Sequence, residues 1–143
     1  MKVQQLKDKG AIFLENVEEG LRGYSNEIRR MEAFEAYNTL EALCLTHGWE
    51  NSFADFYYHT FDEEVQENIE ASLEEEEVEY LREKCCPSDR EELIFPLDAT
   101  LLRIIVKLNA REILFSTIYF VGENEKRSTW WGNYNKEYIV FTD

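Results

Sequence analysis

The sequence contains few of the residues that divide a chain or cross-link it. Its 143 residues include only two prolines and six glycines, and no tract of Gly, Ser or Pro separates one part from another. We therefore expect a single domain covering residues 1–143. Cys44, Cys85 and Cys86 are an odd number with two adjacent in sequence, which argues against a disulfide-rich scaffold and predicts reduced thiols.

Long apolar stretches are also missing. The longest run without a charged residue covers positions 113–122, about half the length of a membrane-spanning helix. The first residues contain no apolar block of the length found in a secretion signal. The sequence therefore argues against a transmembrane helix and predicts a cytoplasmic protein with no membrane partner.

Basic residues are scarce. The chain has 15 Lys and Arg against 30 Asp and Glu, a net charge of -15. Binding to nucleic acid depends on neutralising phosphates with Lys and Arg, so this balance argues against a nucleic-acid partner. It favours a basic protein as a partner, because opposite fields attract over distance. The acidity is local, since residues 50–92 hold 16 acidic and 3 basic residues.

Apolar residues spaced three and four apart predict helices over most of the first 92 residues. We expect helices over 3–21 and 25–44, the second capped by Ser25, and an aromatic helix over 49–61. Two capping patterns, Thr60-x-x-Glu63 and Ser72-x-x-Glu75, predict the starts of two more helices. The second of these helices should end before Pro87.

The pattern changes after Pro96. Residues 101–108 fit both a helix and a strand, and Asp98 as a cap favours the helix. Residues 113–121 read as a central strand, and 129–142 as one returning strand interrupted near Gly132 and Asn133. A third strand is expected from 93–95 or 102–108.

We therefore predict an α+β fold in which an N-terminal bundle of four to five helices packs on a small C-terminal antiparallel sheet. Residues 1–92 should be mainly helical, and residues 93–143 should mix α and β structure and end in a β-hairpin.

The strongest candidate site is the run Glu74, Glu75, Glu76 and Glu77. Four consecutive residues span a full helical turn, so at least one must lie near the apolar side. The others suit a surface that docks a basic protein. The alternatives are a solvated helix face that maintains solubility and, less well matched because the acids are concentrated in one segment, a mimic of DNA.

The second candidate is the aromatic C-terminal hairpin with Trp130, Trp131 and Tyr134. Successive side chains of a strand point to opposite faces, so one of the two indoles should be accessible unless both faces are covered. Exposed Trp and Tyr anchor protein interfaces, and beside Lys and Arg they also stack nucleobases. The alternative is that these rings belong to the core or to a dimer interface.

Two weaker patterns suggest a metal. His47, Asp55 and His59, with Glu63 four residues further on, combine residue types that ligate zinc. The pairs Glu32/Glu35 and Glu64/Glu67 would suit Mg²⁺ in a helical nucleotide hydrolase. No zinc, di-iron or glycine-rich nucleotide motif accompanies them, so we expect no cofactor.

Taken together, these patterns predict a non-enzymatic protein-binding domain that docks a basic partner, as inhibitors and immunity proteins do. The alternatives are a helical hydrolase that uses Mg²⁺, Mn²⁺ or Zn²⁺ to act on nucleotides, and a homodimeric structural module that buries the hairpin.

Overall fold

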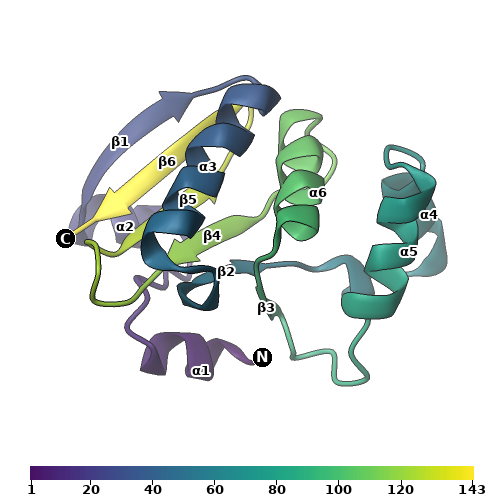
Figure 1. The fold of residues 1–143 in the computed structure, drawn as a ribbon, viewed down its shortest axis with the longest axis horizontal. Helices are drawn as coiled ribbons and strands as arrows, with labels where there is room; N and C mark the ends of the chain where they lie inside the picture. Colours follow the sequence, from purple (N-terminus) through teal and green to yellow (C-terminus); the bar gives the residue numbers. More distant parts are fainter.

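The computed structural model describes residues 1–143 and contains one six-stranded antiparallel sheet with helices packed against it (Figure 1). The order of strands across the sheet is β1-β6-β5-β4-β2-β3. The strands are β1 (Ser25–Arg30), β2 (Ser52–Asp55), β3 (Ile94–Pro96), β4 (Thr117–Phe120), β5 (Ser128–Gly132) and β6 (Glu137–Thr142). The helices are α1 (Val3–Asp8), α2 (Val17–Gly23), α3 (Ala33–His47), α4 (Glu63–Glu70), α5 (Glu75–Lys84) and α6 (Ala99–Ala110), with 3₁₀ turns η1 (Trp49–Asn51) and η2 (Tyr58–Thr60).

The expected fold of an N-terminal helical bundle on a small C-terminal sheet is wrong. The molecule is α+β, but its strands are interleaved with its helices along the whole chain, and the sheet is large. Two strands, β1 and β2, lie in the part of the sequence expected to be mainly helical. The C-terminal strands are the centre of the sheet rather than a separate small unit, because β1 pairs with β6 and β2 pairs with β4.

The two unexpected strands explain the error. In the segment expected to be an aromatic helix, Phe53 packs on one face of the sheet, whereas Ala54 and Phe56 belong to the core on the other face. A strand that is covered on both faces carries apolar residues at odd and even positions alike. Such a run also contains apolar residues three and four apart, as a helix does. In β1, Ile28 lies opposite Ile139 of β6, and this pairing overrides the helical spacing of the sequence.

The C-terminal half is closer to expectation. The predicted helix after the Asp98 cap is α6, the predicted central strand is β4, and residues 93–95 overlap β3. Residues 129–142 are not one interrupted strand, because β5 and β6 are separate antiparallel strands with Trp131 opposite Ile139. The chain reverses between them with Asn135 and Lys136 in left-handed backbone conformations.

The main core lies between one face of the sheet and the helices α3 and α6, which Figure 1 shows side by side across it. The opposite face is covered in two places. Leu6 of α1 packs on Phe53 and Tyr119, while Ile12 and Leu14, before α2, pack on the β6 side. No helix is both long enough and apolar enough to cross a membrane.

Candidate partner-binding surface

The helices α4 and α5 form a separate lobe at one end of the molecule, next to α6 (Figure 1). We call residues 62–84 the acidic lobe. The caps of its helices lie two residues after the predicted caps Thr60 and Ser72. Asp62 caps α4 by accepting a hydrogen bond from the Val65 backbone N–H at 3.0 Å, and Glu74 caps α5. Thr60 instead donates its hydroxyl hydrogen bond to the carbonyl of Tyr57.

One member of the predicted glutamate run is buried, as the helical geometry requires. Glu77 is only 1 % exposed, and its carboxylate binds Lys107 Nζ at 2.7 Å and Arg103 Nε at 3.1 Å. It also accepts the backbone N–H of Glu74 at 2.9 Å, which completes a capping box. Burial opposes ionisation, but these hydrogen bonds outweigh it and lower the pKa of Glu77. Glu77 therefore anchors α5 to α6 and is not part of the exposed surface.

The remaining carboxylates of the lobe are free for a partner, apart from Glu70. Nine of them are exposed and form no ion pair with another part of the chain. Four of the nine line one hollow of about 400 Å³ that contains no basic side chain. The nine are Asp62, Glu63, Glu64, Glu67, Glu74, Glu75, Glu76, Glu79 and Glu83, and the four are Glu74, Glu75, Glu76 and Glu79.

A groove of about 500 Å³ separates α4 from α5. On its lining, Arg82 Nη2 of α5 lies 2.8 Å from Glu70 Oε1 of α4, and the hydroxyl of Tyr58 donates to the same carboxylate. Burial opposes ionisation of Glu70, but the hydrogen bonds from Arg82 and Tyr58 lower its pKa overall. The charge of Glu70 is thus balanced within the groove, while Glu63 and Glu67 add unpaired charge at its edge.

Two consecutive residues at the end of α6 connect the acidic lobe with the aromatic hairpin. The guanidinium of Arg111 donates to the carbonyl of Ser72, in the connection between α4 and α5. The carboxylate of Glu112 accepts the backbone N–H of Asn135, in the turn between β5 and β6, at 2.8 Å. The two surfaces that the sequence singled out therefore lie on either side of the C-terminal end of α6.

The three aromatic residues predicted for the hairpin have different environments. Trp130 is buried against Tyr138 in the main core, and its Nε1–H donates to Ser128 Oγ at 3.1 Å. Trp131 points to the opposite face of the sheet and is half-buried. Tyr134 is 59 % exposed, with its ring 4.8 Å from the ring of Phe115. Trp131 and Tyr134 are therefore accessible, whereas Trp130 is structural.

The predicted metal ligands are not brought together. His47 is buried at the end of α3, where its Nδ1 lies 2.9 Å from the carbonyl oxygen of Val121. His59 packs edge-on against Phe95, and its two ring nitrogens have no hydrogen-bond partner. Across the chain, no three His, Cys, Asp or Glu side chains are arranged to hold a metal ion, and Glu63 is exposed on the lobe.

The carboxylate pairs proposed for Mg²⁺ lie on separate elements. Glu32 precedes α3 and binds Lys136 Nζ at 2.6 Å, and Glu35 is exposed in the first turn of that helix. Glu64 and Glu67 are on α4, in the acidic lobe. They do not form one cluster of metal-ligating side chains.

Asp55 has a role that the sequence did not indicate. Its carboxylate accepts the Thr117 backbone N–H at 2.7 Å and has no cationic partner. Burial raises its pKa to about 7, although the bond from Thr117 acts in the opposite direction. No sequence pattern predicts this raised pKa, because it depends on the neighbours that the sheet places around β2.

A second feature missed by the sequence is Phe34. The expected helix over 25–44 placed this residue on the buried face, but α3 begins only at Ala33, and Phe34 is 80 % exposed. It lines a small hollow together with Val106 and Lys107 of α6.

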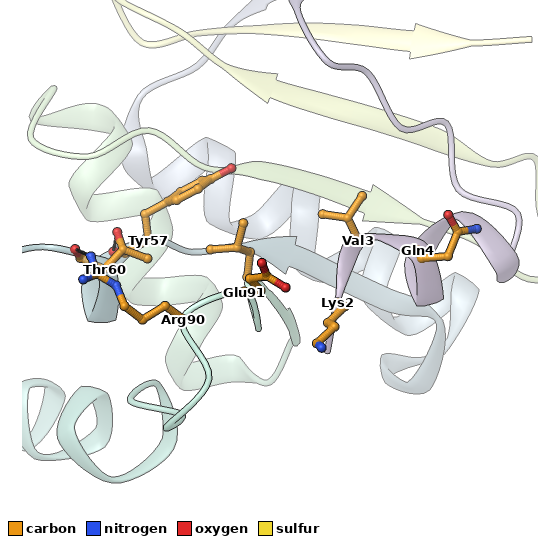
Figure 2. A pocket seen from close by; sticks show the side chains of 8 residues that line it. Lys2, Val3, Gln4, Tyr57, Thr60, Arg90 and Glu91 are labelled. Carbon is orange, nitrogen blue, oxygen red and sulfur yellow. Dashed lines mark hydrogen bonds between the residues drawn. The ribbon is translucent and has the colours of Figure 1, made fainter.

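Another pocket lies between α1 and the segments around η2 and β3 (Figure 2). It has a volume of about 570 Å³, with Val3 and Gln4 on one side and Tyr57 and Thr60 on the other. Both cations on its lining have partners within the chain. Lys2 forms an ion pair with Asp89 at 3.3 Å, and the guanidinium of Arg90 donates a hydrogen bond to a backbone carbonyl. The carboxylate of Glu91, which also lines this pocket, has no ion-pair partner, and Arg90 bonds only a neutral carbonyl.

No protein family, curated protein or solved structure matches the chain.

Proposed function

We propose that this protein is a non-enzymatic binding domain of inhibitor or immunity type that docks a basic protein. The docking surface consists of the exposed carboxylates of the acidic lobe together with Tyr134 of the hairpin. The observation that carries the proposal is a pair of hydrogen bonds at the C-terminal end of α6: Arg111 donates to Ser72 of the lobe, and Glu112 accepts from Asn135 of the hairpin turn.

The charge of the lobe supports this proposal. A carboxylate already paired with a cation adds little to the outward field, whereas the nine exposed carboxylates of the lobe are unpaired. Such a field steers an oppositely charged partner during diffusion and raises the association rate. The bonds from Glu77 to Arg103 and Lys107 keep the lobe fixed on α6, so its charges are presented in one arrangement.

The aromatic part of the surface would contribute to the lifetime of the complex. Tyrosine is enriched among the residues that dominate binding energy, because its ring buries a large area and its hydroxyl remains hydrogen-bonded. Tyr134 and Phe34 are both strongly exposed, and Phe34 lies beside Val106 and Lys107 of α6. We therefore expect the carboxylates to set the association rate and the aromatic rings to slow dissociation.

The test is to immobilise the protein and recover proteins bound from a lysate of its source, then measure the kinetics of the purified partner by surface plasmon resonance. Compared with the wild type, the triple variant Glu74→Gln, Glu75→Gln and Glu76→Gln should associate several-fold more slowly at low salt and about equally at 0.5 M salt. Tyr134→Ala should mainly increase the dissociation rate.

The matched control is Glu15→Gln, Glu123→Gln and Glu125→Gln, which removes the same charge from exposed residues outside the lobe. It should reduce the association rate much less. Equal effects of the two triple variants would show that only net charge matters, and a partner whose binding is insensitive to salt and to Tyr134→Ala would contradict the proposal.

A further inference from the structure

The strand β1 forms one edge of the sheet, and no further strand pairs with its outer side (Figure 1). Five of its six residues are exposed, and Ile28 is 65 % exposed. The opposite edge is different, because β3 has only three residues, ends at Pro96, and bonds the Ile94 N–H to the carbonyl of Met1. A long open edge with unpaired backbone groups is a template for another strand.

The hydrogen bonds to β6 determine which backbone groups of β1 point outward. Met31 continues the register of the pair and donates its N–H to the carbonyl of Lys136 at 3.0 Å. Antiparallel strands alternate hydrogen-bonded and non-hydrogen-bonded pairs, so the backbone groups of Arg29 and Glu27 also point toward β6. Those of Asn26, Ile28 and Arg30 point away from the sheet and have no strand beside them.

This alternation restricts how two copies of β1 can pair antiparallel. Outward groups must meet outward groups, which permits two-fold axes at residues but not between them. Axes at Glu27 and Ile28 overlap five of the six residues of β1, whereas axes at Asn26 and Arg29 overlap only three. An axis at Glu27 places that carboxylate opposite its own copy, and an axis at Arg29 does the same with two guanidinium groups. Like charges directly opposite each other destabilise a sheet.

The axis at Ile28 instead brings opposite charges together. It places Glu27 of each copy opposite Arg29 of the other in a non-hydrogen-bonded pair, where side chains approach most closely. Neither Glu27 nor Arg29 has an ion-pair partner within the chain, although the Arg29 guanidinium carbon lies 5.4 Å from the centre of the Trp130 ring. The backbone pairs would be Ile28 with Ile28 and Asn26 with Arg30, each exchanging two hydrogen bonds.

The apolar side chains favour the same axis. Ile28 lies opposite Ile139, which lies opposite Trp131, so the three form one row on the sheet face that also carries α1 and α2. Pairing at Ile28 would join this row to its copy and remove the exposed isoleucine from water.

We propose that two copies of this protein associate through β1, antiparallel and centred on Ile28, so that their sheets become one. This interface is separate from the acidic lobe and lies beside the hairpin, because β1 pairs with β6, but it does not use Tyr134 and is independent of the proposed function. A single pair of edge strands buries less area than a permanent dimer interface, so the association should depend on concentration.

The test uses sedimentation velocity of the full chain over a dilution series. The wild type should approach twice the monomer mass of 17.0 kDa at high concentration and dissociate on dilution. Glu27→Arg and Arg29→Glu should each be monomeric, because each places like charges opposite one another. Mixing these two variants should restore a dimer, since every cross-strand pair then has opposite charges, and the double variant should dimerise by itself.

Ile28→Pro provides a second test. It removes an N–H that points outward, so the bonds between β1 and β6 are preserved while the edge is blocked. Circular dichroism checks that each variant is folded. Hydrogen exchange should show that the amides of Asn26, Ile28 and Arg30 become protected as wild-type concentration rises. A wild type that is monomeric up to its solubility limit, or a dimer that persists after charge reversal, would overturn the proposal.

Discussion

At the level of single residues, one buried and one partly buried carboxylate are stabilised in opposite protonation states. Glu77 is surrounded by donors and cations, which favour its ionised form. Asp55 has one backbone donor and no cation, so burial favours its neutral form and raises its pKa to about 7. The difference arises from the neighbours that the fold places around each group, because both are ordinary acidic side chains in the sequence.

Asp55 makes stability fall as the pH rises. In the unfolded chain its carboxyl ionises near its ordinary pKa of 3.8, whereas in the fold it remains protonated up to about pH 7. The native state therefore binds more protons within this window, and stability decreases as pH rises through it. Asp55→Asn, which preserves an acceptor for Thr117, should raise the free energy of unfolding by roughly 1–3 kcal/mol at pH 8 and remove this slope.

Chemical denaturation between pH 4 and pH 8 measures this effect. Asp8→Asn, a substitution of an exposed aspartate, is the control and should follow the wild type. If Asp55→Asn is less stable than the wild type at pH 8, the carboxylate has a stabilising partner in solution and the interpretation fails.

At the scale of elements, the attachment of α5 to α6 depends on Glu77. Glu77→Gln retains the side-chain shape but leaves Lys107 and Arg103 without a carboxylate, and should cost about 1–3 kcal/mol of stability. The loss should be smaller than for a fully buried ion pair, since both cations reach solvent. Because the pKa of Glu77 is lowered, its contribution is present above its ordinary pKa of 4.5 and disappears as the pH falls further.

The measurement is urea unfolding of Glu77→Gln and of Glu76→Gln, its exposed neighbour. Glu76→Gln should change stability by less than about 0.5 kcal/mol. The curves of Glu77→Gln and the wild type should converge as the pH is lowered through the acidic range. Equal stabilities at pH 7 would show that Glu77 does not anchor the lobe.

At the scale of the whole molecule, the charge is large and unevenly distributed. The chain carries a net charge of -15, and the unpaired carboxylates of the acidic lobe lie close together. Mutual repulsion of like charges destabilises a compact state, and salt screens it. We expect the Tm to rise by about 2–5 °C between 0.02 M and 0.5 M NaCl.

Differential scanning calorimetry with and without the triple substitution of Glu74, Glu75 and Glu76 by Gln checks this prediction. The variant should melt higher than the wild type at low salt and respond less to NaCl. A Tm that falls with salt in the wild type would mean that attractive ion pairs outweigh repulsion across the molecule.

Periodicity left residues 101–108 between a helix and a strand, and the Asp98 cap favoured the helix that the structure shows as α6. It misassigned β1 and β2, because the pairing of Ile28 with Ile139 and the burial of Phe53 and Ala54 on opposite faces involve residues far apart in sequence. A local pattern contains no information about such partners, and tertiary pairing decides between a helix and a strand when both fit.

Some features of the candidate surface can likewise be predicted from the sequence, whereas others depend on the fold. Composition and spacing alone establish the acidity, its concentration in residues 50–92, and the need for one glutamate of the 74–77 run to be near the apolar side. The fold is needed to identify this residue as Glu77, to bury Trp130, and to bond the lobe and the hairpin turn to the consecutive residues Arg111 and Glu112 at the end of α6. The physical reason is that composition and spacing are properties of the chain alone, whereas burial, pKa and proximity depend on neighbours that the fold supplies.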